Sequence, residues 1–102
     1  MVDNARDFFA TLEGRVPPEK IEGMDATYRF DLEGAGSWHV TVRDGKVTVK
    51  ESDEPADCVV RSSEKTLAKV IRGEQKPAVA LMLGKIKIDG DMGLALKLQN
   101  IL

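Results

Sequence analysis

Three segments in the first half of the chain alternate between apolar and polar side chains, as strands with one buried face do. Apolar residues occupy every second position in these segments: 28–32, 38–42 and 47–49. Asp44-Gly45 separates the second from the third, and such a pair supplies the positive φ angles of a type I′ turn. The pattern predicts an antiparallel meander of three strands with one dry face and one wet face.

Apolar residues at helical spacing predict a helix before this meander. They are Ala5, Phe8, Phe9 and Leu12. Asp3 is a plausible N-cap, and Gly14 is suited to ending the helix in the left-handed conformation. Residues 17–21 begin with two prolines and predict a turn or a single helical turn, because proline lacks the N–H that a longer helix needs.

After the meander, the spacing predicts three helices and two further strands. Residues 56–61 form a less regular fourth strand, and Ser62 or Ser63 then caps a helix that Gly73 ends. Residues 85–89 form the fifth strand, with isoleucines on one face and lysines on the other. Meandering strands early and helices late predict an α+β fold: a five-stranded, mainly antiparallel sheet with helices packed on one face.

Two C-terminal helices carry more apolar surface than docking on a sheet requires. The short helix at 78–83, which Gly84 ends, is apolar on every side. The last helix begins at Asp91 and runs to the C-terminus, and its apolar arc spans roughly 220°, where a stripe a little over about 100° wide is enough to dock on a core. An internal ligand, a second subunit or mutual packing of the two helices could cover the excess.

The composition limits the classes of protein that fit. With 102 residues, 42% hydrophobic and 31% charged, the chain is long enough for one domain, residues 1–102, but not for two independent cores. A net charge of −2 without any basic run argues against nucleic acid. The longest apolar run, 78–83, is too short for a transmembrane segment, and the N-terminus lacks the features of a secretion signal. A single cysteine fits a reducing compartment, and we expect the cytoplasm.

No group of residues has the spacing of a catalytic or metal site. The one histidine, His39, falls on the polar face of its strand and is expected to be a solvated surface residue. Cys58 has Asp57 and Val59 as neighbours, which would not lower the pKa of a thiol. The glycines form no phosphate-binding motif, and the acidic residues at 51–57 lack the order of a calcium loop. We therefore expect no enzyme, no metal and no cofactor.

The chain resembles the sterol carrier protein 2 family over nearly its whole length. The sheet half carries the resemblance in residues 27–30, 36–47 and 56–60. The more specific part is 73–91 followed by 94–98, where a short apolar helix leads through Gly84-Lys85 into the last strand and helix. The resemblance implies that sheet and helices enclose an apolar tunnel for fatty acids, fatty acyl-CoA, sterols or other lipids.

Matching positions of the family imply a wall for this tunnel. Its ligand-binding residues would be Phe30, Trp38, Val40, Leu81, Met82, Leu83, Ile86, Leu94, Leu98 and Leu102. Arg72, Lys76 or Lys85 could attract a charged head group. The sequence ends without the peroxisomal address found in the family, which suits a free-standing prokaryotic relative.

Two functions follow from this reading. The first is non-enzymatic binding and intracellular carriage of a lipid or fatty acyl ligand, with transient membrane contact. The second is a module for dimerisation or for presenting substrate to a partner enzyme, in which the apolar arc of the last helix packs across a two-fold axis. The sequence fits either a monomer or a homodimer.

Overall fold

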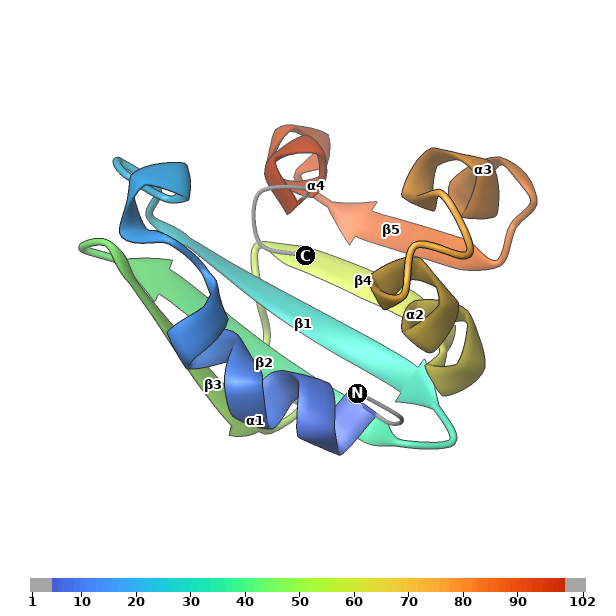
Figure 1. The fold of residues 1–102 in the computed structure, drawn as a ribbon. Coiled ribbons are helices and arrows are strands. Elements are labelled where there is room, and N and C mark those ends of the chain that lie inside the picture. The colour runs from blue at the N-terminus through green and yellow to red at the C-terminus, as the bar shows by residue number, and fades with distance from the viewer. Residues whose placement is uncertain (1–4, 99–102) are drawn as a thin grey trace.

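The structure, a computed structural model, describes residues 5–98 (Figure 1). The elements of the N-terminal half are α1 (Ala5–Arg15), a 3₁₀ turn (Pro18–Lys20), β1 (Ala26–Glu33), β2 (Gly36–Arg43) and β3 (Lys46–Glu51). The C-terminal half contains β4 (Cys58–Ser63), α2 (Glu64–Ile71), α3 (Pro77–Met82), β5 (Ile86–Gly90) and α4 (Met92–Lys97). The order of elements is the one that the hydrophobic pattern predicts.

The strands form one sheet in the order β3-β2-β1-β4-β5. All neighbours are antiparallel except β1 and β4, which are parallel. At the β2–β3 turn, φ is 54° at Asp44 and 72° at Gly45, as a type I′ turn requires. These findings confirm the mainly antiparallel α+β fold and the three-stranded meander.

The α-helices lie together on one face of the sheet (Figure 1). The strand residues that point to this face are apolar and buried along β1 and β2. The N-terminal helix α1 lies over the β2–β3 half of the sheet, and the later helices α2, α3 and α4 lie over β4 and β5 (Figure 1). Different helices therefore cover the two halves of the sheet, and this difference decides where a ligand could fit.

The helix α1 is packed tightly against its half of the sheet. Phe8, Phe9 and Leu12 are buried, and the ring of Phe9 stacks on Trp38 with centroids 5.0 Å apart. The carboxylate of Glu13 accepts a hydrogen bond from the Val49 N–H on the edge strand β3 (2.8 Å). The prediction that Gly14 ends this helix is wrong, since the helix continues to Arg15.

The boundaries of other elements differ slightly from the sequence prediction. The fourth strand begins at Cys58 and extends to Ser63, because its pairing with β1 continues to that residue. Ser63 then caps α2 by accepting a hydrogen bond from the Thr66 N–H. The predicted N-cap at Asp3 and the predicted course of the last helix beyond Leu98 lie outside the described residues.

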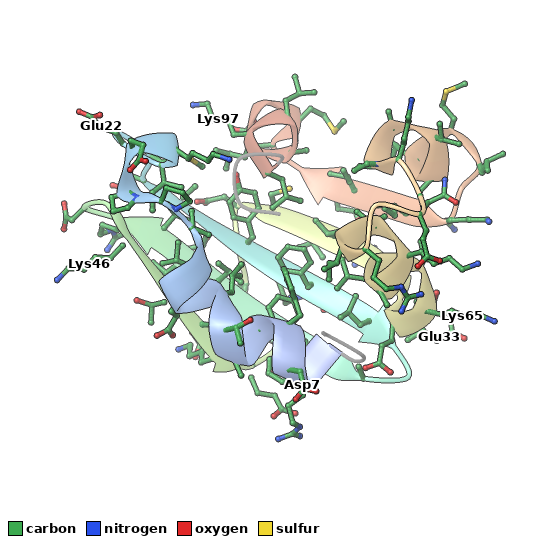
Figure 2. The ribbon with its side chains drawn as sticks, in the orientation of Figure 1. Asp7, Glu22, Glu33, Lys46, Lys65 and Lys97 are labelled. Atoms are coloured by element: carbon green, nitrogen blue, oxygen red, sulfur yellow. The ribbon has the colours of Figure 1, made fainter. Side chains whose placement is uncertain are left out.

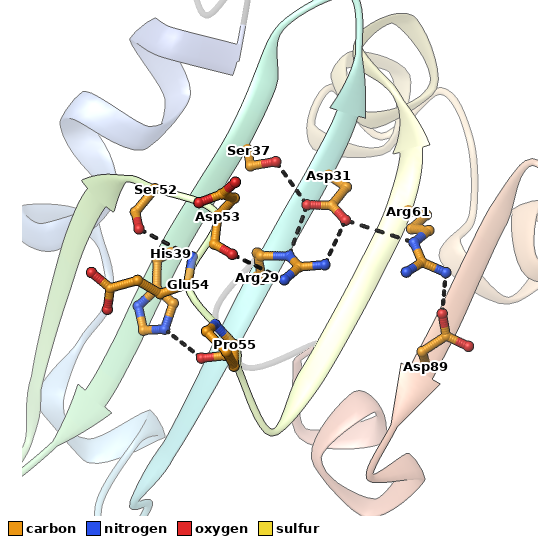
Figure 3. Close-up of polar contacts among 10 residues, drawn as sticks. All are labelled: Arg29, Asp31, Ser37, His39, Ser52, Asp53, Glu54, Pro55, Arg61 and Asp89. Atoms are coloured by element: carbon orange, nitrogen blue, oxygen red, sulfur yellow. Dashed lines mark hydrogen bonds and ion pairs between the residues drawn. The ribbon is translucent and has the colours of Figure 1, made fainter.

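The opposite face of the sheet carries a polar network (Figure 3). Arg29 contacts both carboxylate oxygens of Asp31 (2.9 and 3.0 Å), and Ser37 donates a hydrogen bond to the same carboxylate (2.8 Å). Arg61 bridges Asp31 and Asp89. Burial alone would raise the pKa of Asp31, but these hydrogen bonds and the two guanidinium charges outweigh it and hold the pKa below its usual value.

His39 corrects one sequence expectation. Its side chain points to the polar face as predicted, but it is only 6% exposed and is not a solvated surface residue. The connection after β3 folds over it, and the Nε2–H of His39 donates to the Pro55 carbonyl (3.3 Å; Figure 3). Arg29 reaches the same connection through the Asp53 carbonyl (3.2 Å). A loop therefore covers part of a face that the alternation alone marks as wet.

Candidate functional site

An apolar groove of about 370 Å³ lies between the β4–β5 half of the sheet and the helices α2, α3 and α4. Its floor consists of inward-facing strand residues: Phe30, Val60, Ser62, Ile86 and Ile88. Its walls come from the three helices and the residue after α4: Leu67, Val70, Ile71, Pro77, Ala78, Leu81, Met92, Ala95, Leu96 and Leu98. The volume lies within the range of about 300–1,000 Å³ typical of small-molecule sites.

The helix α3 stands at the edge of the groove because of how it starts and ends. Pro77 occupies its first turn, where no N–H is needed, and Ala80 is its buried residue. At its C-terminus, the Gly84 N–H donates to the Leu81 carbonyl (3.1 Å) and the Lys85 N–H to the Ala80 carbonyl (2.9 Å), which is a Schellman motif. The chain therefore turns directly into β5 and leaves a short helix with one small residue against the core.

The helix α4 forms the opposite wall. Hydrogen bonds hold it at its N-terminus and at the Leu94 carbonyl. Asp91 caps its N-terminus by accepting hydrogen bonds from the Gly93 and Leu94 N–H groups (2.8 and 3.2 Å). Tyr28, buried in β1, donates its hydroxyl hydrogen to the Leu94 carbonyl (2.7 Å). Burial, with smaller contributions from Cys58 and Asp91, raises the pKa of Tyr28 to about 12. The tyrosine therefore stays a neutral donor that ties α4 to the sheet.

Four of the ten predicted ligand-binding residues line the groove: Phe30, Leu81, Ile86 and Leu98. They come from β1, α3, β5 and the end of α4, so that the fold brings together residues far apart in the sequence. Leu102 lies outside the described residues. That these residues bind a ligand stays a prediction.

The other five predicted residues lie away from the groove wall. Trp38 stacks on the first helix, and Val40 is buried in the same half of the sheet, opposite β1 and β3. Met82 and Leu83 project into solvent, 86% and 63% exposed. Leu94 packs against the core, and its carbonyl accepts the bond from the buried tyrosine. The alternation shows which strand residues point inward, but it does not show which of them lie under α1 and which lie under the C-terminal helices.

Sequence reasoning missed the contribution of α2 to the groove. Leu67, Val70 and Ile71 form one wall, and their helical spacing was visible as an amphipathic stretch. It also missed Val60 and Ile88, which pair across β4 and β5 on the inward face. The alternation of β5 indicated that Ile88 points inward. The position of α2 over β4 depends on tertiary packing and could not be predicted from the sequence pattern.

The chemistry of the groove is that of an apolar binding site. Among its lining residues, Ser62 has the one polar side chain, and its hydroxyl donates to the Ser63 carbonyl (3.0 Å). Burial raises the pKa of the nearby core thiol of Cys58, which keeps it protonated and unreactive. Within residues 5–98, no three His, Cys, Asp or Glu residues gather as metal ligands would.

A polar trough adjoins the groove at Ser62, which lines both. Three basic residues line this trough, Lys85, Lys87 and Arg61, together with two acidic ones, Asp31 and Glu33. Of the three head-group candidates from the sequence, Lys85 is therefore the one beside the groove's polar end.

Arg72, the second of those candidates, forms an ion pair with Glu74 (2.7 Å). No helix of the described part of the chain combines the length and the apolar content that crossing a bilayer requires.

The structure is thus an α+β fold with an apolar groove between a sheet and its helices. A model of the SCP-2 sterol transfer family matches residues 9–102, and the chain belongs to this family. The resemblance seen in the sequence is thereby confirmed.

Similar sequences form a minor part of longer proteins. Hydroxysteroid dehydrogenase-like protein 2 of Danio rerio is 33% identical over 100 residues, which are 94% of this chain and 24% of that protein. Sterol carrier protein 2 of Bos taurus is 39% identical over 92 residues, 87% of this chain and 17% of that protein. The chain thus spans about a quarter or less of the curated relatives that it matches.

Solved structures share the fold. The sterol carrier protein domain 2 of Helicoverpa armigera superposes with a TM-score of 0.76 at 29% identity, covering 92% of this chain and 81% of that one. The stereoselective inverting sec-alkylsulfatase Pisa1 from Pseudomonas sp. superposes with a TM-score of 0.79 at 26% identity, covering 92% of this chain and 16% of that one.

Proposed function

We propose that this protein is a non-enzymatic carrier of hydrophobic ligands in the cytoplasm, with residues 1–102 acting as one lipid-binding domain. Its ligands are fatty acids and fatty acyl-CoA, with sterols as a further class. The observation that carries the proposal is the apolar groove of about 370 Å³ in a chain of the SCP-2 sterol transfer family. A flexible alkyl chain suits the groove better than a rigid ring system, because a chain can leave through the open side.

The size of the groove sets the strength of binding. If each carbon takes about the 30 Å³ that a water molecule occupies in the liquid, the groove holds roughly a dozen carbons. At about 0.8 kcal/mol for each buried methylene, ten of them contribute about 8 kcal/mol. Association costs about 4–15 kcal/mol, so the alkyl tail alone binds weakly and a polar anchor matters. The trough beside Ser62, with Lys85 in its wall, is where we place a carboxylate or phosphate.

The direct test is to look for a bound acyl compound. Native mass spectrometry and organic extraction of the purified protein should detect one, and calorimetric titration with fatty acids should give saturable binding. Trp38 is a poor fluorescent reporter, because it stacks on Phe9 beneath the first helix and away from the groove. A protein that is purified without lipid and gives no heat with fatty acids of any length would contradict the proposal.

The second candidate is an interaction module that dimerises or presents substrate to an enzyme. The observation in its favour is that similar sequences occupy a minor part of much longer proteins. Sedimentation velocity separates the two functions: the module predicts a dimer that Leu96→Asp disrupts, without any uptake of fatty acid. Leu96 is suited to this test because it is 70% exposed, whereas Leu98 is buried.

A further inference from the structure

The large apolar side chains that are exposed in the described residues all belong to α3, α4 or the residue that follows α3. We call them the apolar rim: Val79, Leu81, Met82, Leu83, Met92 and Leu96. Both helices pack against β5 and lie at the same edge of the molecule (Figure 1). A gathering of exposed apolar groups on one side of a small domain marks a surface that contacts a protein or a membrane.

Half of the apolar rim borders the groove. Leu81, Met92 and Leu96 line the groove while parts of their side chains face solvent. A ligand that enters the groove past these exposed side chains therefore passes over the rim. By contrast, α1 buries its large apolar residues against the sheet and leaves none of them exposed. The surface for docking is at the C-terminal helices.

Lysines frame the apolar rim. Lys76 precedes α3, Lys85 follows it, and Lys97 lies in the last turn of α4. None of the three forms an ion pair among the described residues. The nearby acids are engaged elsewhere: Asp89 pairs with Arg61, and Asp91 caps α4.

The charge is distributed unevenly along the chain. Residues 76–98 carry four lysines and two aspartates, whereas acids exceed bases in the rest of the chain. Figure 2 shows Lys97 on α4, whereas Lys46 projects from the β2–β3 hairpin on another side of the molecule. The segment that carries the rim therefore has a net positive charge, which an anionic surface attracts.

We propose that the apolar rim docks on the surface of a bilayer containing anionic lipids, with Lys76, Lys85 and Lys97 at the head groups and the groove mouth against the membrane. Apolar side chains beside lysines are the combination that binds such an interface. A second copy of the chain fits less well, because its own lysines would face these and like charges across an interface repel. The inference deepens the proposed carrier function, although vesicle binding itself does not depend on that function.

Vesicle co-sedimentation tests the docking. The wild-type protein should bind vesicles of phosphatidylcholine with phosphatidylserine more strongly than vesicles of phosphatidylcholine alone, and salt should weaken the difference. Lys97→Glu should lower binding to the anionic vesicles by at least about five-fold, since one lysine near such a surface contributes about that factor. Lys46→Glu makes the same change of charge away from the rim and should leave binding unchanged.

The apolar part of the rim is tested by the double variant Met82→Asp, Leu83→Asp. Both side chains are exposed and lie outside the groove wall, so the variant should fold and should still bind fatty acid in solution. Its binding to both kinds of vesicle should fall by about ten-fold or more.

The outcomes keep the two proposals distinct. Normal vesicle binding without fatty acid binding would contradict the carrier function and leave docking intact. Wild-type protein that ignores anionic vesicles, or equal binding by Lys97→Glu and Lys46→Glu, would overturn the docking. So would a dimer in sedimentation that the double variant dissociates, because the rim would then be covered by a second copy.

Discussion

Ala95→Phe is the substitution that most directly tests whether an alkyl chain occupies the groove. Ala95 lies on α4, is half-buried and contributes to the groove wall. A phenyl ring at this position would extend into the space between α4 and the sheet. The change leaves the N-cap of the helix and its bond to the buried tyrosine in place.

The magnitude follows from the volume. A phenyl ring adds six carbons to a groove of about 370 Å³, and at about 30 Å³ for each carbon it takes roughly half of the space. A chain long enough to fill the wild-type groove then loses about six buried methylenes, or up to about 5 kcal/mol of binding. Shorter chains keep their contacts. The free protein should become more stable, because the ring is buried where there was open space.

The assay is calorimetric titration with saturated fatty acids of increasing length. Affinity for the wild type should rise with length until roughly a dozen carbons and then level off. For Ala95→Phe the plateau should come about six carbons earlier. Ala10→Phe, the same change on the exposed side of α1, is the control and should keep the wild-type profile. An unchanged profile in a folded Ala95→Phe protein would place the chain outside this groove and refute the reasoning.

Four further predictions concern stability. A Cβ at Gly90 would lie 2.3 Å from the Asp57 carbonyl oxygen at a φ of +104°, so Gly90→Ala should cost at least about 3 kcal/mol in urea denaturation. Gly84→Ala, at positive φ in open space, should cost about 1 kcal/mol. Tyr28→Phe removes the hydrogen bond to α4 and should lower the melting temperature by the equivalent of about 1 kcal/mol. Because the pKa of Asp31 is lowered in the folded protein, its contribution to stability is present above the unfolded pKa and is lost as acid protonates it. Asp31→Asn should therefore be less stable than the wild type at neutral pH, with the difference shrinking below about pH 4 in denaturation at each pH.

Much of the fold could be predicted from local signals. Alternation located β1, β2 and β5, and Asp44-Gly45 specified both the turn type and the register of the hairpin. Asp91 and the pair Ser62-Ser63 indicated the starts of their helices, because a side-chain oxygen can satisfy free amides there, and the structure selects Ser63 of the pair. Each of these features depends on residues that lie close together in the sequence.

Contacts between distant segments were not predictable in the same way. His39 is buried because the connection at Pro55 folds over it, and no periodicity in β2 encodes that loop. Trp38 and Phe30 share the inward face and pair across β1 and β2, yet Phe30 alone borders the groove. Which helix covers which strand is decided by the packing of whole elements.

The groove stays open because its lining contains small residues at positions where larger apolar side chains would fill it. Ser62 on β4, Ala78 on α3 and Ala95 on α4 come from three different sides of the same space. A larger apolar residue at any of them would bury more surface and stabilise the free protein, at the expense of the space for a ligand. The apolar rim also leaves surface unburied, since its exposed apolar side chains gather at one edge of the molecule and are not scattered singly. Both the open groove and the exposed apolar rim lower the stability of the free protein. Binding a lipid in the groove and docking the rim on a membrane would together explain why the chain keeps them.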